Sequence, residues 1–134
     1  MSMQYFYRFE EQEQIPVAPD YSTTEAAWIK GDRMHILMGH KKKGSGSRPH
    51  RHPNEQFIYV LKGHLKATVE DQEKIVSPGG LIHVPSNALH SIVATTDEDV
   101  QFFVAKDTSW GITGIPENGE KSGGYYKRGY EPSK

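Results

Sequence analysis

One short stretch of the chain, RPHRHPNEQFIYVLKG at residues 48–63, carries two histidines, a glutamate and a glutamine within seven positions. His50 and His52 are two residues apart, so their side chains point the same way if the chain is extended there. Imidazole nitrogens and side-chain oxygens are ligands that divalent transition metals accept. Because the chain has no cysteine, thiolate ligands and disulfide bonds are excluded, and a metal site has to use histidine nitrogens and oxygens.

Two side chains beside these histidines could supply an oxygen ligand. Gln56 lies four residues after His52 and shares its face of an extended strand, whereas Glu55 has the opposite parity. A turn at residues 53–54 would break this count, so alternation favours Gln56 without deciding between the two.

The surrounding glycines give a second count. Residues 44–63 follow the pattern G-x5-H-x-H-x3-Q-x6-G, which resembles the first motif of the cupin superfamily, G-x5-H-x-H-x3/4-E-x6-G, with glutamine in place of the acid. The spacing to Gly63 fits Gln56 and is one residue too long from Glu55. The resemblance to a small single-domain cupin implies an all-β jelly-roll barrel (a double-stranded β-helix) that holds a divalent transition metal such as Fe, Ni, Zn or Mn through His50, His52 and Gln56.

The second cupin motif, G-x5-P-x-G-x2-H-x3-N, fits this chain in two registers. One runs from residue 78 to 87 and uses His83; the other runs from residue 79 and uses His90, with Asn87 in place of the second glycine. We prefer the second register, because Pro-Gly-Gly at 78–80 can then open a strand and Pro-Ser-Asn at 85–87 can turn the chain. Asparagine is the residue that best replaces glycine where φ is positive. His90 is therefore the predicted third histidine ligand, and His83 is a candidate for the pocket wall.

The rest of the sequence indicates the elements that would hold this site. From residue 33 onward, short runs rich in Val, Ile, Phe and Tyr alternate with turn clusters, and no long helical period occurs. This pattern predicts an all-β barrel over residues 31–110, preceded by an N-terminal arm at 1–30 and followed by a loop-rich C-terminal tail at 111–134 that packs on the barrel. Gly63, with Lys62 before it, predicts a tight hairpin between two strands.

Composition limits the partners. Sixteen basic and seventeen acidic residues give a net charge near zero, which predicts no nucleic-acid or membrane partner and favours a small-molecule substrate. The lack of a signal-like or membrane-spanning apolar run predicts a cytoplasmic location. An aromatic N-terminal arm favours a homodimer. The lysine run at residues 41–43 is expected to be a solvated strand end.

The chemistry follows from the ligand type. Three neutral imidazoles and an amide leave a divalent metal with a charge near +2, which attracts anionic oxygens. Resemblance to cupins that act on uronates or keto sugars implies a Lewis-acid isomerase or lyase for a small anionic oxygenated substrate, namely a uronate, keto acid or keto sugar. Two alternatives stay open: a non-haem Fe(II) dioxygenase, and a small-molecule or sugar-binding cupin without catalysis.

Further roles are assigned to four side chains near the predicted ligands. The candidates for proton transfer are His83, Glu55 and Tyr59. Arg48 has the parity of His50 and could bind a substrate carboxylate through two parallel hydrogen bonds.

Overall fold

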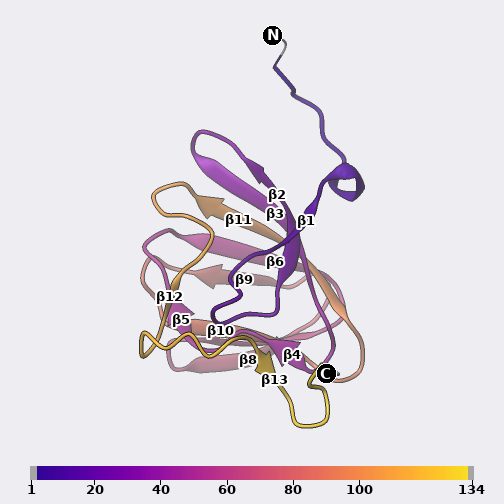
Figure 1. Ribbon diagram of the computed structural model, residues 1–134, viewed down its shortest axis with the longest axis vertical. Coiled ribbons are helices and arrows are strands. Elements are labelled where there is room, and N and C mark those ends of the chain that lie inside the picture. Colours follow the sequence, from indigo (N-terminus) through magenta and orange to yellow (C-terminus); the bar gives the residue numbers. More distant parts are fainter. Residues whose placement is uncertain (1–2, 133–134) are drawn as a thin grey trace.

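Two antiparallel sheets form the body of the protein, whose residues 3–132 are described by a computed structural model (Figure 1). The first sheet has the order β1 (Gln14–Pro16), β2 (Glu25–Lys30), β3 (Met34–Lys41), β11 (Val100–Asp107), β6 (Gln56–Lys62) and β9 (Leu81–Val84). The second contains β12 (Ile115–Pro116), β5 (His50–Arg51), β10 (His90–Ala94), β4 (Ser45–Gly46), β13 (Tyr125–Tyr126), β7 (Leu65–Val69) and β8 (Gln72–Val76). The described residues contain a single 3-10 turn, η1 (Phe9–Glu11), and no α-helix, so the all-β jelly-roll prediction is confirmed.

The hydrophobic core lies between the two sheets because each strand alternates its side chains. In β6, Ile58 and Val60 are buried while Phe57 and Tyr59 are exposed. Burying an aliphatic side chain of this size contributes roughly 1.5–3 kcal/mol, so this alternation fixes the face that each strand turns inward. The core cluster consists of Ala26, Leu37, Ile58, Val60, Leu65, Ala67, Ile82, Val84, Ala88, Ile92, Ala94, Val100, Phe102 and Val104.

The predicted hairpin at Lys62 and Gly63 is wrong in one respect. Gly63 does have a positive φ of 77°, and an added Cβ would lie 2.6 Å from the carbonyl oxygen of Asp99. However, β6 pairs with β9 and β11, whereas β7 pairs with β8 and β10. The chain therefore crosses from one sheet to the other at Gly63, and strands that are adjacent in sequence are not paired.

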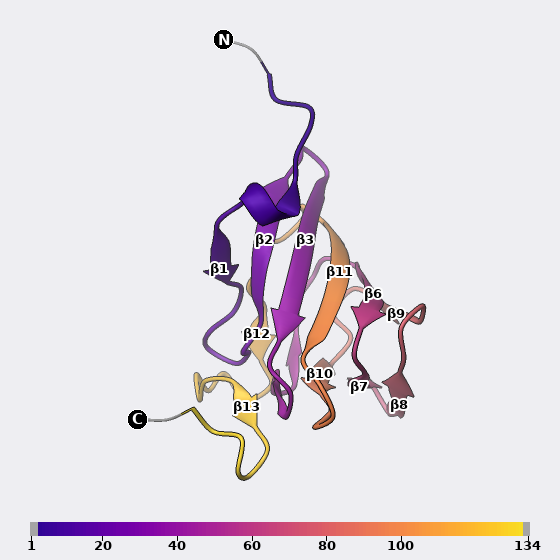
Figure 2. The ribbon, with the colours of Figure 1, turned by 90° about the vertical axis from the view of Figure 1, so that its right-hand side faces the viewer.

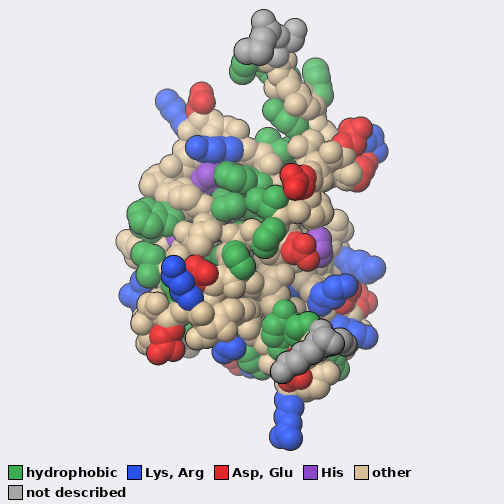
Figure 3. All heavy atoms as spheres, in the orientation of Figure 1, with side chains coloured by type: hydrophobic (Ala, Val, Ile, Leu, Met, Phe, Trp, Pro, Cys, Tyr) green, Lys and Arg blue, Asp and Glu red, His purple; other side chains and the backbone are tan. Residues whose placement is uncertain are grey.

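The N-terminal part of the chain combines a sheet strand with an extended segment. β2 pairs with β3 along its whole length, and β1 pairs with β2. Ahead of η1, the chain stands clear of the body, and apolar side chains project from it (Figures 1 and 3). Phe6 is 88% exposed there, and Tyr5 is also exposed. Dimerisation through this segment and the boundary at residue 30 stay predictions.

The C-terminal tail adds two short strands to the second sheet. β12 pairs with β5, and β13 pairs with β4, so the tail runs along this sheet rather than away from it (Figure 2). Arg48 holds the tail through its Nε, which donates a hydrogen bond to the carbonyl oxygen of Gly123 at 3.0 Å. Within residues 3–132, no helix is long and apolar enough to cross a membrane.

Candidate metal centre

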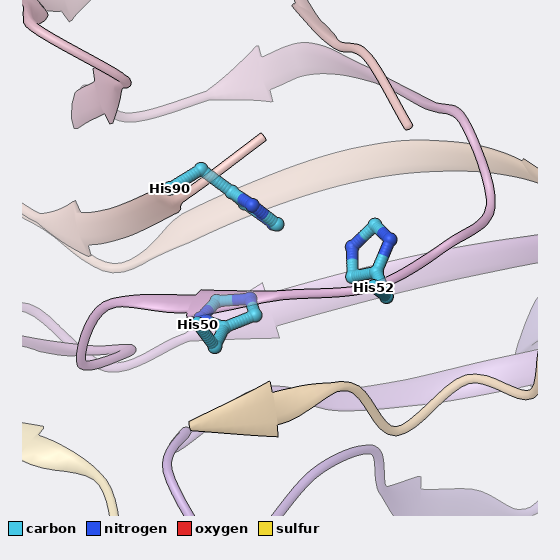
Figure 4. A group of neighbouring side chains, drawn as sticks. All are labelled: His50, His52 and His90. Atoms are coloured by element: carbon cyan, nitrogen blue, oxygen red, sulfur yellow. The ribbon is translucent and has the colours of Figure 1, made fainter. Parts of the chain in front are cut away.

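Three buried histidines meet inside the barrel. His50 in β5 is the Cα partner of His90 in β10, and His52 follows two residues after His50. One ring nitrogen from each lies within 4.8 Å of the other two. The rings point toward one another in Figure 4, with centroid distances of 4.2 Å for His50–His90 and 4.8 Å for His52–His90.

Backbone carbonyls fix the tautomer of all three rings. The Nδ1–H of His50 donates to the carbonyl oxygen two residues earlier at 2.7 Å, and that of His90 does the same at 2.9 Å. The Nδ1–H of His52 donates to the carbonyl oxygen two residues later at 2.9 Å. A carbonyl can only accept, so the hydrogen is on Nδ1 and the Nε2 lone pair is left for another partner. Metal-binding histidines are typically held in this way.

Gln56 completes the group with an oxygen. It is 7% exposed, and its Oε1 lies 3.0 Å from Nε2 of His52. Because Nε2 carries a lone pair in the tautomer above, two acceptors face each other, and a cation between them would be attracted by both. Three imidazole nitrogens and one amide oxygen thus form a donor set that fits a divalent transition metal. Glu55 is exposed, as expected from its opposite parity.

The electrostatics of the site keep the imidazoles neutral. Burial lowers the pKa of His90 to about 3, and it lowers the pKa of His50 well below the ordinary value of 6.5. The pKa of His52 is lowered too, first by burial and then by the positive charge of Lys106. Neutral imidazole is the form that binds a metal, so the three rings are ready for one at neutral pH.

The turn before β10 ties His90 to the segment that carries the other histidines. Asn87 has a φ of 63°, in the left-handed region that asparagine tolerates. Its backbone N–H donates to the carbonyl oxygen of His52 at 2.8 Å, and the hydroxyl of Ser86 donates to the carbonyl oxygen of Pro53. The second motif register therefore matches the structure, which places His90 and not His83 beside His50 and His52.

Comparison with known proteins gives the family. The family described as "Cupin domain" matches residues 37–106, more than half of the chain. The chain belongs to the cupin family. No curated protein sequence matches it.

Similar solved structures include three proteins with different names. The polyketide cyclase RemF from Streptomyces resistomycificus is 23% identical, with a TM-score of 0.68 over 78% of this chain and 80% of RemF. KdgF from Halomonas sp. is 20% identical, with a TM-score of 0.67 over 77% of this chain and 94% of KdgF. A predicted oxalate decarboxylase from Thermotoga maritima is 18% identical, with a TM-score of 0.67 over 77% and 98%. At these identities the likeness shows the fold of this cupin and not its reaction.

An interior cavity of about 50 Å³ opens beside the histidine cluster of this cupin. His50, Gln56 and His90 line it together with Lys41 and Lys106. No acidic side chain from residues 3–132 lines this cavity.

The expectation that the lysine run is solvated is wrong for Lys41, which is 1% exposed. In β3, positions 37, 39 and 41 are all buried because they share one parity, so the side chains of Leu37 and Lys41 point inward, whereas Lys42 and Lys43 follow the strand and are exposed. Burial lowers the pKa of Lys41 to about 7. The first lysine of the run therefore belongs to the interior of the barrel.

Two further residues of the cavity were missed from the sequence. Lys106 shares the inward-facing parity of Phe102 and Val104 in β11, and this parity could have identified it from the sequence. Burial lowers the pKa of Lys106 to about 8. Tyr21 lies in the loop between β1 and β2, where no pattern marked it. Its ring stacks on His50 at a centroid distance of 4.0 Å, and its hydroxyl oxygen accepts the backbone N–H of Gly114 at 2.7 Å.

The three predicted proton-transfer residues are not brought to the metal centre. His83 lies between the buried Ile82 and Val84 of β9, so it points to the outer face of the first sheet. There its Nε2 lies 2.7 Å from a carboxylate oxygen of Glu55. Tyr59 is exposed on the same outer face in β6. All three lie on the side of the sheet opposite to the histidine cluster.

Arg48 also lies outside the interior cavity. Besides its bond to Gly123, its Nη2 donates to the carbonyl oxygen of Gly124 at 3.4 Å. Arg48 lines an outer groove of about 480 Å³ that shares Tyr21 and Ser47 with the interior cavity. Its guanidinium therefore holds the C-terminal tail at the wall of this groove.

Proposed function

We propose that this cupin is a metal-dependent enzyme that acts on a small anionic oxygenated substrate by Lewis-acid chemistry of the isomerase or lyase type. The observation that carries the proposal is the convergence of three histidines whose Nδ1 hydrogens are all bound to backbone carbonyls. A divalent metal held there would supply Lewis acidity toward a carbonyl, enol or carboxylate oxygen of the substrate.

The charge of the donor set supports an anionic substrate. His50, His52, His90 and Gln56 are neutral ligands, so none of them offsets the charge of a divalent metal. The cavity beside them contains two lysines and no acidic side chain among the described residues. An oxyanion would therefore be attracted from both sides.

The size of the cavity favours the smallest of the three predicted substrate classes. The cavity is small, because its volume is about 50 Å³ and one water molecule takes about 30 Å³ in the liquid. This small size favours a short keto or hydroxy acid over a uronate or a keto sugar. The names of the similar structures, a polyketide cyclase and a predicted oxalate decarboxylase among them, belong to different reactions and leave this choice to the site.

The experiment that tests the proposal combines elemental analysis with substrate screening. The purified protein is analysed for Fe, Ni, Zn and Mn, and short keto and hydroxy acids are then assayed for turnover beside an oxygen electrode. We expect one divalent metal per chain and turnover without oxygen uptake. Uptake of one O2 per substrate would replace the proposal with the Fe(II) dioxygenase, and a ligand that binds and is recovered unchanged would replace it with a binding role.

A further inference from the structure

Lys41 and Lys106 are the two charged side chains of the interior cavity, and neither has a charged partner there. Lys41 is 1% exposed and Lys106 is 5% exposed. The Nζ of Lys41 donates to the hydroxyl oxygens of Ser22 and Thr24, and the Nζ of Lys106 donates to the carbonyl oxygen of Ile112 at 3.2 Å. These acceptors are all neutral. The ion pairs found within residues 3–132 include neither lysine.

The two lysines reach the cavity from opposite ends of the first sheet. Lys41 is the Cα partner of Val100 at the start of β11, whereas Lys106 lies near the end of β11. Lys106 is also the Cα partner of Gln56, which places it at the metal-centre end. Each side chain points inward by strand alternation, and both lysines line the interior cavity. They are near enough for the charge of Lys106 to lower the pKa of Lys41.

Such an arrangement is costly in the absence of an anion. A buried ammonium group loses its hydration, and neutral hydroxyl or carbonyl acceptors restore only part of it. The ring of Phe102 lies 5.6 Å from the Nζ of Lys41 and adds a further weak attraction, but it brings no negative charge. A bound anion would supply the missing charge for both lysines.

We infer that Lys41 and Lys106 form an anion-binding subsite that takes the carboxylate group of a small acid. This inference rests on the proposed function, because it assumes that the rest of the same small acid faces the candidate metal centre. The role predicted for Arg48 then belongs to these two lysines, because they line the interior cavity and Arg48 does not.

The chemical class of the ligand follows from charge and size. Two ammonium donors and no acidic neighbour select an anion, and about 50 Å³ limits the group to a few heavy atoms. Acetate has this charge and size. Acetamide has the same shape without the charge. Comparing acetate with acetamide therefore shows whether the subsite recognises the charge of the ligand or only its shape.

The test is a titration of the metal-loaded protein at pH 6, where both lysines are mostly protonated, with acetate and with acetamide at low chloride concentration, followed by calorimetry or NMR. The variants are Lys41→Met and Lys106→Met, and the matched control is Lys42→Met, which changes the next, exposed lysine of the same run. We expect acetate to bind at least tenfold more weakly to both inner variants and with unchanged affinity to Lys42→Met. Acetamide should bind at least tenfold more weakly than acetate to the wild type.

Metal content is measured on the same samples, so that failure of the subsite and failure of the metal centre give different results. Full metal content with wild-type acetate affinity in Lys41→Met and Lys106→Met would overturn the subsite and leave the metal centre standing. If the wild-type protein takes up no metal during loading but acetate binding is still lost in both inner variants, the result would support the subsite and overturn the proposed function. Equal affinity for acetate and acetamide in the wild type would also overturn the subsite.

Discussion

The interior of this barrel has two parts that differ in how they affect stability. The apolar part, which contains Ile58, Val60 and Leu65, buries side chains that gain about 25 cal/mol per Å² when they leave water. The polar part holds three histidines, a glutamine and two lysines, whose burial costs free energy unless partners restore their hydration. Both parts occur along single strands, since Gln56 shares its face of β6 with Ile58 and Val60. The polar part is therefore a site built into a core that would be more stable without it.

The largest expected difference between the two parts is in metal affinity, and it comes from removing a histidine of the polar part. His90→Ala removes one of three converging imidazoles, and we expect metal affinity to fall by more than about 100-fold, beyond the usual loss for an outer partner of a ligand. Elemental analysis after dialysis measures the loss. His83→Ala is the matched control, because His83 is exposed on the outer face. An equal loss of metal in His83→Ala would contradict the assignment of the site.

In the apolar part, truncation should cost stability and leave the metal in place. Ile58→Ala removes three buried carbon atoms from a fully buried position, and we expect the free energy of unfolding to fall by about 2–5 kcal/mol. Chemical denaturation measures this change, and elemental analysis of the folded variant measures the metal. If folded Ile58→Ala lost its metal with no change in stability, the apolar part would act on metal binding and not on stability, which would contradict the difference between the two parts.

Removing a buried charge should act in the opposite direction. Lys41→Met keeps an unbranched apolar chain of the same length as the lysine methylenes and removes the ammonium group, so we expect the ligand-free protein to gain about 1–4 kcal/mol of stability at pH 6. The pKa of Lys41 is lowered from 10.5 to about 7, mainly by burial and then by the charge of Lys106. Thermal unfolding at several pH values measures the gain, with Lys42→Met as the control.

The pH dependence of this gain has a definite sign. Between about pH 7 and pH 10.5 the unfolded chain keeps a proton on Lys41 that the folded chain has lost, so wild-type stability rises with pH across that window. Besides Lys106, the group that interacts with the charge of Lys41 is His90, whose pKa of about 3 keeps it neutral in this range. The advantage of Lys41→Met should therefore be largest below pH 7 and disappear near pH 10.5. A gain that is the same at pH 6 and pH 10.5 would show that it does not come from the charge.

The smallest effect concerns the oxygen ligand. We expect Gln56→Ala to weaken metal binding by about tenfold, because one of four donors is lost while the three histidines remain. Glu55→Gln, the control at the neighbouring position, should leave metal affinity unchanged. Competition with a chelator of known affinity measures both. The reverse result, with metal lost from Glu55→Gln and kept by Gln56→Ala, would show that the parity argument is wrong.

The strands and the inward faces of His50, His52 and Gln56 could be predicted from local spacing, whereas His90, which meets His50 through the pairing of β5 with β10, could be predicted only from the resemblance to the cupin motifs. Alternation placed His50, His52 and Gln56 on one face, and Asn87 in a turn selected His90 over His83. These features involve neighbours within a few residues. The short strand runs predicted the all-β barrel for the same reason.

The residues that escaped prediction depend on contacts between distant segments. Lys41 resembles the exposed lysines that follow it, and its burial depends on Ser22 and Thr24, which lie in the loop that covers this end of the cavity. The partners of β6 and β7 are likewise chosen by strands far along the chain, so the turn at Gly63 could be predicted but not its crossing between sheets. Tyr21 belongs to a loop, where no periodicity indicates which way a side chain points.

The most direct measurement of the metal centre is anomalous diffraction from crystals of the protein as purified. We expect one peak at about 2.0–2.2 Å from the Nε2 atoms of His50, His52 and His90, with the side-chain oxygen of Gln56 as a further ligand. A peak beside His83 and Glu55, or no peak at the three histidines in crystals soaked with Zn²⁺, would contradict the assignment of this site.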